Sequence, residues 1–138
     1  MKLDRTIDAA VLAVLAQEAL HLLCAGDTDT LAARFGYALR YDREASDAID
    51  NDLRRCLTQV GASELVLPAA HPQPKVVYLG QSGTGLVALV QCLALTDNNA
   101  TLLIELVVTE NGMDKYIMLE EISVYGQNVS TKRSKDFR

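Results

Sequence analysis

Two glutamates in the second half of the sequence, Glu105 and Glu120, have a spacing that could support acid–base chemistry. They lie in two runs rich in Leu, Ile and Val that are joined at Asn111-Gly112, a dipeptide typical of a two-residue β-hairpin turn. In the predicted hairpin the two glutamates are diagonal neighbours, with Cβ atoms about 7–8 Å apart. Carboxylates at such a separation can exchange protons with a substrate because each raises the pKa of the other. No histidine or other base accompanies them, so we predict no catalytic residue. We expect Glu105, Glu120 and the neighbouring Tyr116 to contact a partner or ligand, with a plain solvated sheet face as the alternative.

The densest cluster of charge is acidic and falls before the middle of the chain. The formal net charge is −5, and residues 126–138 carry four basic residues against one acidic residue, which leaves −8 for residues 1–125. Charges of one sign gathered on one surface attract an oppositely charged protein and speed its association. The alternative is that these acids only complement the N-terminal dipole of a helix. The residues that we predict to bind a partner are Asp42, Glu44, Asp47 and Asp50, and Asp52 follows them in the cluster.

Other residue types associated with catalysis or metal binding lack the context that such chemistry needs. The glycine-rich run 80–85 opens into a strand pattern and lacks a Lys-Ser/Thr ending, so it predicts a hairpin turn and not a phosphate loop. The three cysteines sit among apolar residues at no ligand spacing, which is typical of free thiols in a reducing compartment. Neither histidine lies at ligand spacing from another donor. We therefore predict no metal and no cofactor.

The elements that must position these side chains fall into two blocks. Apolar residues recur at helical spacing in the first half, whereas the second half consists of extended apolar runs separated by turns. Helices followed by antiparallel strands indicate a segregated α+β fold. We predict three N-terminal helices packed on one face of a four-stranded antiparallel meander, in a single domain of residues 1–125 with a basic, flexible tail at 126–138. The helices are expected at 6–25, from Asp27 or Thr28 to Gly36, and from Asp42 or Ser46 to Val60, and the strands at 75–79, 86–96, 101–110 and 115–125.

The predicted register divides the sheet into two unlike faces. With Glu110 opposite Met113, one face of the hairpin is wholly apolar, and the helices are expected to pack there. The other face carries Glu105, Tyr116 and Glu120 among apolar residues, so it is neither clean core nor clean solvent surface. The apolar face consists of Leu102, Ile104, Leu106, Val108, Ile117 and Leu119, and pairing of Thr96 with Thr101 would add Ala88, Val90, Cys92 and Ala94 to the other face.

We expect no targeting segment among the N-terminal residues. The apolar run 9–16 is far short of the ~20 residues that a membrane span requires, and Asp4 and Asp8 interrupt the region in front of it. We therefore expect a cytoplasmic protein with no membrane partner. The acidic body also makes direct binding of nucleic acid unfavourable.

The order of elements over residues 6–125 resembles the cystatin-like and nuclear-transport-factor-2-like α+β rolls. The modest size, acidic body, acidic cluster, free cysteines and lack of a catalytic set make the chain similar to the immunity proteins of bacterial contact-dependent growth inhibition and related polymorphic toxin systems. This resemblance implies a protein that is not an enzyme and that binds a basic toxin, with a nuclease domain as the expected partner, and blocks its active site. Immunity proteins share no common sequence signature, so no site residue is carried over.

Two other functions fit the same sequence. A small-molecule-binding protein or enzyme of the roll type would have its pocket between the sheet and the helices. A homo-oligomeric structural protein would pair through the semi-apolar sheet face. In the small-molecule-binding protein, the polar side chains available to the pocket would be Tyr78, Gln91, Glu105, Tyr116 and Glu120.

Overall fold

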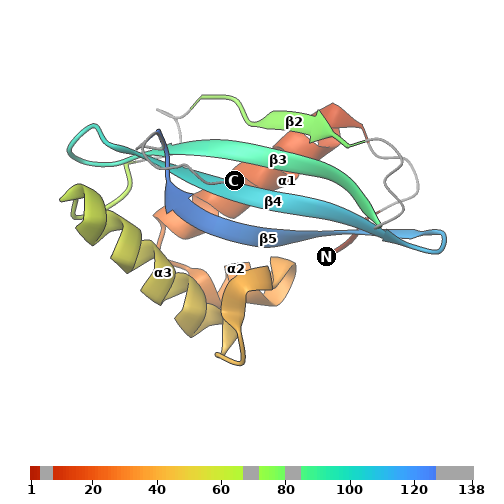
Figure 1. Cartoon of the computed structure of the whole chain (residues 1–138), viewed down its shortest axis with the longest axis horizontal. Helices are drawn as coiled ribbons and strands as arrows, with labels where there is room; N and C mark the ends of the chain where they lie inside the picture. The colour runs from red at the N-terminus through yellow and green to blue at the C-terminus, as the bar shows by residue number, and fades with distance from the viewer. Residues whose placement is uncertain (4–7, 67–71, 80–84, 127–138) are drawn as a thin grey trace.

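The computed structural model describes residues 1–3, 8–66, 72–79 and 85–126. In this part of the chain the protein has an α+β fold, with a five-stranded antiparallel sheet of order β1-β5-β4-β3-β2. Figure 1 shows α1 crossing behind β3 and β4, while α2 and α3 lie beside β5. The elements are β1 (Lys2–Leu3), α1 (Ala9–Cys24), α2 (Thr28–Phe35), the short 3-10 helix η1 (Ala38–Arg40), α3 (Ala45–Val60), β2 (Lys75–Tyr78), β3 (Leu86–Leu95), β4 (Thr101–Asn111) and β5 (Asp114–Val124).

Each of the three α-helices begins at an acidic residue whose side chain caps the first turn. Asp8 accepts a hydrogen bond from the backbone N–H of Val11 at 2.9 Å. Asp27 and Glu44 make the equivalent contact with the residue three positions on. These caps satisfy backbone donors that would otherwise lack a partner. The third helix therefore begins at Ala45, between the two predicted starts.

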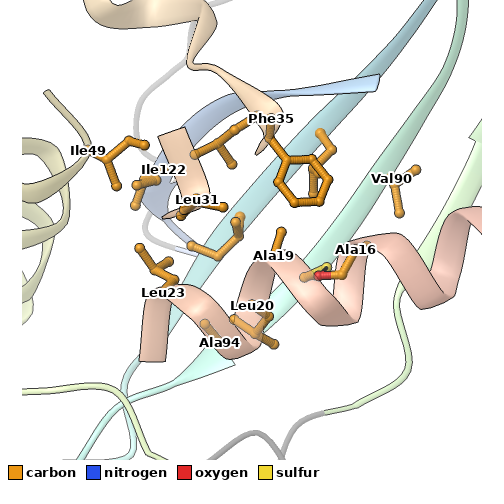
Figure 2. Close-up of a cluster of buried hydrophobic side chains, with 14 of the residues drawn as sticks. Ala16, Ala19, Leu20, Leu23, Leu31, Phe35, Ile49, Val90, Ala94 and Ile122 are labelled. Atoms are coloured by element: carbon orange, nitrogen blue, oxygen red, sulfur yellow. Dashed lines mark hydrogen bonds between the residues drawn. The ribbon is translucent and has the colours of Figure 1, made fainter. Parts of the chain in front are cut away.

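The core lies between the helices and the inner face of the sheet. Figure 2 shows side chains of α1, α2 and α3 gathered with Val90, Ala94 and Ile122 of the sheet. The wholly apolar face predicted for the hairpin is confirmed, because all of its residues are buried in this core. Burying one such side chain contributes about 1.5–3 kcal/mol, so this face decides which side of the sheet the helices cover.

Strand β3 presents to the helices the residues that the sequence predicts on the opposite face, and that prediction is wrong. Leu95, not Thr96, pairs with Thr101. This shifts the register by one residue, and a one-residue slip moves every side chain to the other face. Thr96 instead opens the loop, where its Oγ1 donates to the carbonyl of Ala100 at 2.9 Å. The buried residues of β3 are Ala88, Val90, Cys92 and Ala94.

The turn between β4 and β5 lies one residue later than predicted. Asn111 pairs with Asp114, so the two loop residues are Gly112 and Met113. Gly112 has a φ of +67°, and a glycine at the first of two loop positions suits a type II′ turn. The prediction that Glu110 pairs with Met113 is therefore wrong.

A β-bulge in β5 changes the partner of Glu105. The ladder slips by one residue next to Glu105, so that Glu105 lies opposite Glu121 and Glu120 is the extra residue. Leu119 and Ile122, on either side of the two glutamates, are both buried. The predicted diagonal pair of Glu105 and Glu120 is therefore wrong, and the cross-strand pair is Glu105 and Glu121.

The sheet has five strands, and the predicted four-stranded sheet lacks β1. This strand pairs with Tyr116 and Lys115 at the edge of β5, and the backbone N–H of Ile117 donates to the carbonyl of Met1 at 2.8 Å. The three helices therefore follow a strand, and the prediction that helices come first is wrong. Two residues are too few to show a periodicity, so only the pairing partner reveals this strand.

Two further expectations concern the end of the chain and its surroundings. The basic tail predicted at 126–138 lies outside the described residues, apart from Gly126. None of the described helices is long and apolar enough to cross a membrane.

Candidate partner-binding site

The predicted acidic cluster lies at the start of α3, next to α2. Asp42, Glu44 and Asp47 are exposed, and Asp50 is half-buried. Asp52, by contrast, is only 3% exposed. Three of the four acids predicted to bind a partner can therefore reach one directly, and Asp50 can do so in part.

Two hydroxyl groups join the N-terminal ends of α2 and α3 beneath this cluster. The Oγ atoms of Thr28 and Ser46 are buried and lie 3.0 Å apart. Thr28 also donates to Asp50 at 3.1 Å, and Ser46 donates to Asp29 at 2.7 Å. Asp29, which sequence reasoning missed, therefore belongs to the same surface. We call this surface the acidic edge, and it consists of Asp29, Asp42, Glu44, Asp47 and Asp50.

Asp52 does not belong to the acidic edge because three donors use its carboxylate. The Tyr37 hydroxyl donates to it at 2.6 Å, and Nη1 atoms of Arg43 and Arg55 donate at 3.1 and 2.9 Å. Burial alone would raise the pKa of Asp52, but the hydrogen bonds from Arg43, Tyr37 and Arg55 outweigh it and lower the pKa. The ionised carboxylate is thus a structural centre that ties α3 to the segment before it.

Arg43 also braces the loop that carries Asp42. Its Nη2 donates to the carbonyl of Leu39 at 2.6 Å, and its Nε donates to the carbonyl of Arg40 at 2.7 Å. Tyr41 and Asp42 have φ angles of 46° and 66°, a conformation that costs a non-glycine residue on the order of 1–3 kcal/mol. The fold holds this strained pair in place with the Tyr41 side chain 73% exposed. Sequence reasoning missed Tyr41, because its position depends on the contacts of Arg43.

The other predicted partner-binding residues lie elsewhere. Glu105 and Tyr116 point away from the helices, on the outer face of the sheet, because their strand neighbours are buried on the inner face. Glu120 occupies the bulge of β5. The structure therefore divides the predicted residues between the acidic edge on the helical side and the outer face of the sheet.

Glu105 and Glu121 form a pair of acids on that outer face. Gln91 Nε2 donates to Glu105 Oε2 at 2.9 Å, whereas Glu121 makes no hydrogen bond or ion pair with any described side chain. Burial, followed by the charges of Glu105 and Glu120, raises the pKa of Glu121. The only signal of this pair in the sequence is the broken alternation of apolar residues around Glu120-Glu121.

Two hollows that described residues line are on the helical side. One of about 290 Å³ lies between the end of α1, α3 and residues 63–65, and one of about 540 Å³ lies on the outer surface of α3. Neither is lined by a residue of β2, β3, β4 or β5. The polar residues predicted for a pocket between sheet and helices do not converge on either hollow, since Gln91, Glu105 and Tyr116 lie on the outer face.

No disulfide joins the three cysteines, and Cys56 and Cys92 are buried in the core. Burial raises the pKa of Cys92 to about 12 and that of the half-buried Cys24 to about 11. Thiols with such pKa values stay protonated near neutral pH and are poor nucleophiles. Within the described ranges, no group of three or more His, Cys, Asp or Glu side chains could hold a metal ion.

Comparison of the chain with protein-family models, curated proteins and solved structures found no match. The resemblance to immunity proteins therefore stays a prediction, and the geometry above carries the functional argument.

Proposed function

We propose that this protein is an immunity protein that binds a basic toxin through the acidic edge and blocks the active site of that toxin. A nuclease domain is the partner that fits best, because such an enzyme must hold phosphate groups with Lys and Arg side chains. The observation that carries the proposal is the acidic edge itself, with carboxylates from two helix starts beside an exposed aromatic side chain on a braced loop.

The arrangement supplies both parts of a typical protein interface. Tyr side chains are enriched among the residues that contribute most of the binding energy, and Tyr41 is exposed on a loop that needs little ordering on binding. The exposed carboxylates Asp42, Glu44 and Asp47 would surround it and meet the basic site of the toxin. These acids also stand at the start of α3, where the helix dipole stabilises them.

The proposal is tested by expressing the protein together with the toxin-domain protein of the gene immediately upstream. Cell survival and a complex that purifies intact are expected. The variant Tyr41→Ala should weaken binding by about 2 kcal/mol, and Asp42→Asn with Asp47→Asn should mainly slow association. Titration calorimetry and stopped-flow binding measure the two effects.

Glu110→Gln is the matched control, because Glu110 is an exposed acid near the β4–β5 turn, away from the acidic edge (Figure 1). It should leave survival and affinity unchanged. Equal toxicity with and without the protein would rule the proposal out for that toxin. If the Tyr41 and Asp42/Asp47 variants bind the toxin with unchanged affinity and association rate, the binding site lies outside the acidic edge.

A further inference from the structure

The outer face of the sheet has no covering element among the described helices and strands. Figure 1 shows the helices only behind and beside the sheet. Its central strands nevertheless present half-buried leucines, Leu89, Leu93 and Leu103, and Met118 of β5 is 37% exposed. Val107 in the middle of this face is only 4% exposed. An apolar face that no described helix or strand covers typically marks an interaction surface.

The side chains of this face lie in rows that cross the sheet. The first row is polar and consists of Lys75, Gln91, Glu105 and Glu121 on β2, β3, β4 and β5. The adjoining row on one side is apolar throughout and consists of Val77, Leu89, Val107 and Met118. On the other side, Leu93 lies opposite Leu103, and Ser123 of β5 completes that row.

The polar row leaves unlike charges apart and like charges together. Glu105 and Glu121 are directly opposite, which is unfavourable for two carboxylates. Lys75 lies three strands from Glu121, roughly 14 Å away at the usual spacing of 4.8 Å, and makes no ion pair with a described residue. The row is thus positive at one end and negative at the other.

We infer that a second copy of this chain packs on the outer sheet face, around a two-fold axis that runs parallel to the strands between β3 and β4. Such an axis places each row on the same row of the partner in the opposite order, so that β2 faces the partner's β5 and β3 faces the partner's β4. Lys75 then meets the partner's Glu121, and Gln91 meets the partner's Glu105. In the adjoining rows Val77 meets the partner's Met118, and Leu93 meets the partner's Leu103.

The symmetry of the pattern is the reason to choose a second copy over a different protein. A two-fold interface uses one surface twice, so that surface must complement itself. Here the apolar side chains of each row face apolar side chains of the partner, and the polar row places Lys75 on Glu121, which makes no ion pair with a described side chain. Two sheets packed with aligned strands are a common arrangement, with their twist setting an angle of about 30° between them. The acidic edge lies on the helical side and stays free, so this inference does not depend on the proposed function.

A charge swap tests the inference on the full chain by analytical ultracentrifugation. The unmodified protein should sediment with a mass of twice 15.0 kDa. Lys75→Glu places two acids together in the dimer and Glu121→Lys places two cations together, so each single change should raise the dimer dissociation constant about tenfold or more. The double variant exchanges the partners and should return to within about threefold of the unmodified protein.

Glu64→Lys serves as the matched control, because it reverses an exposed acid outside the outer sheet face and should leave the dissociation constant unchanged. Circular dichroism checks that each variant is folded. A protein that stays monomeric at millimolar concentration overturns the inference and leaves the face to a different protein. The inference is also overturned if neither single change alters the dimer dissociation constant, or if the double variant does not restore it.

Discussion

At the scale of single residues, the carboxylates of this protein differ mainly in what surrounds them. Asp52 has three donors within hydrogen-bond distance, whereas Glu121 faces a second acid. At Asp52 burial would raise the pKa, but the hydrogen bonds outweigh it and lower the pKa, whereas burial, followed by the charges of Glu105 and Glu120, raises the pKa of Glu121. Folding is therefore coupled to pH in opposite directions at these two sites.

Replacing Asp52 by Asn should destabilise the protein by about 2 kcal/mol, because Arg43 and Tyr37 lose an ionised acceptor. The pKa of Asp52 is lowered in the folded state, so its contribution is present above the unfolded pKa of about 3.9 and is lost as the pH falls through the folded value. Urea unfolding at several pH values measures this. Glu64→Gln should change stability by less than about 0.5 kcal/mol, and an equal loss in both variants would contradict the structural role of Asp52.

Replacing Glu121 by Gln should stabilise dilute, monomeric protein at neutral pH by about 0.5 kcal/mol, because it removes the repulsion from Glu105. The pKa of Glu121 is raised in the folded state, so the penalty of its charge is present above the folded value. The penalty disappears as the pH falls to the unfolded pKa of about 4.3. The two proteins should thus have equal stability near that pH, and a gain that persists there would point to a cause other than charge. Thermal unfolding at the two pH values provides the comparison.

At the scale of elements, the β4–β5 hairpin depends on a backbone conformation at one position. Gly112 adopts a positive φ at the first loop residue, and a Cβ there would meet no atom within 4 Å. The requirement for glycine is therefore one of backbone conformation and not of space. The register of the hairpin, and with it the pairing of Glu105 with Glu121, follows from this turn and from the bulge at Glu120.

Gly112→Ala should lower the free energy of unfolding by about 1 kcal/mol, the cost of a left-handed conformation for a residue with a Cβ. The neighbouring Met113 is 79% exposed, so Met113→Ala is the control and should be close to neutral. Chemical unfolding of both variants separates a conformational cost from the general effect of altering the loop. Equal stability of the Gly112→Ala variant and the unmodified protein would show that the turn tolerates another conformation.

At the scale of the whole molecule, two surfaces of different character lie on opposite layers of the fold. The acidic edge belongs to the helices and the segment before α3 and carries exposed charge, whereas the middle of the outer sheet face has one charged row between rows of mainly apolar side chains. Interactions between exposed charges weaken with salt, while burial of apolar side chains does not. The two proposed associations should therefore respond differently to the same change in solution.

Raising the salt concentration from about 0.01 M to 0.15 M should lower the association rate with a basic toxin by about tenfold or more. The dissociation constant of the homodimer should change by less than about threefold, because only one row of its interface is charged. Stopped-flow mixing and ultracentrifugation in the same buffers make the comparison. A toxin association rate that is independent of salt would contradict binding through the acidic edge.

Part of the fold and of the candidate site can be predicted from the sequence. Helix and strand periodicities predict the α+β class and the inner face of the hairpin. Several residues support such a pattern together, as the burial of Leu102, Ile104 and Leu106 on one side of β4 shows. The acidic residues Asp42, Glu44 and Asp47 are exposed, as their position at a helix start suggests.

The remaining features depend on contacts between distant residues. The pairing of β1 with β5 joins residues more than a hundred positions apart, and no local pattern encodes it. A bulge or a one-residue change of loop length reverses the face of a strand, as β3 and Glu120 show. The strained loop at Tyr41 is braced by Arg43, which donates hydrogen bonds both to the loop carbonyls and to Asp52.

Local sequence alone thus determined which segments are helical or extended and where negative charge gathers, because periodicity and composition act over a few neighbouring residues. Only the tertiary structure decided that Asp52 is paired with Arg43 and Arg55, that Asp29 joins the acidic edge, and that Glu105 faces Glu121. The register of a strand changes only in whole residues, and a long-range hydrogen bond joins residues far apart in the sequence. Both therefore depend on how the whole core packs together.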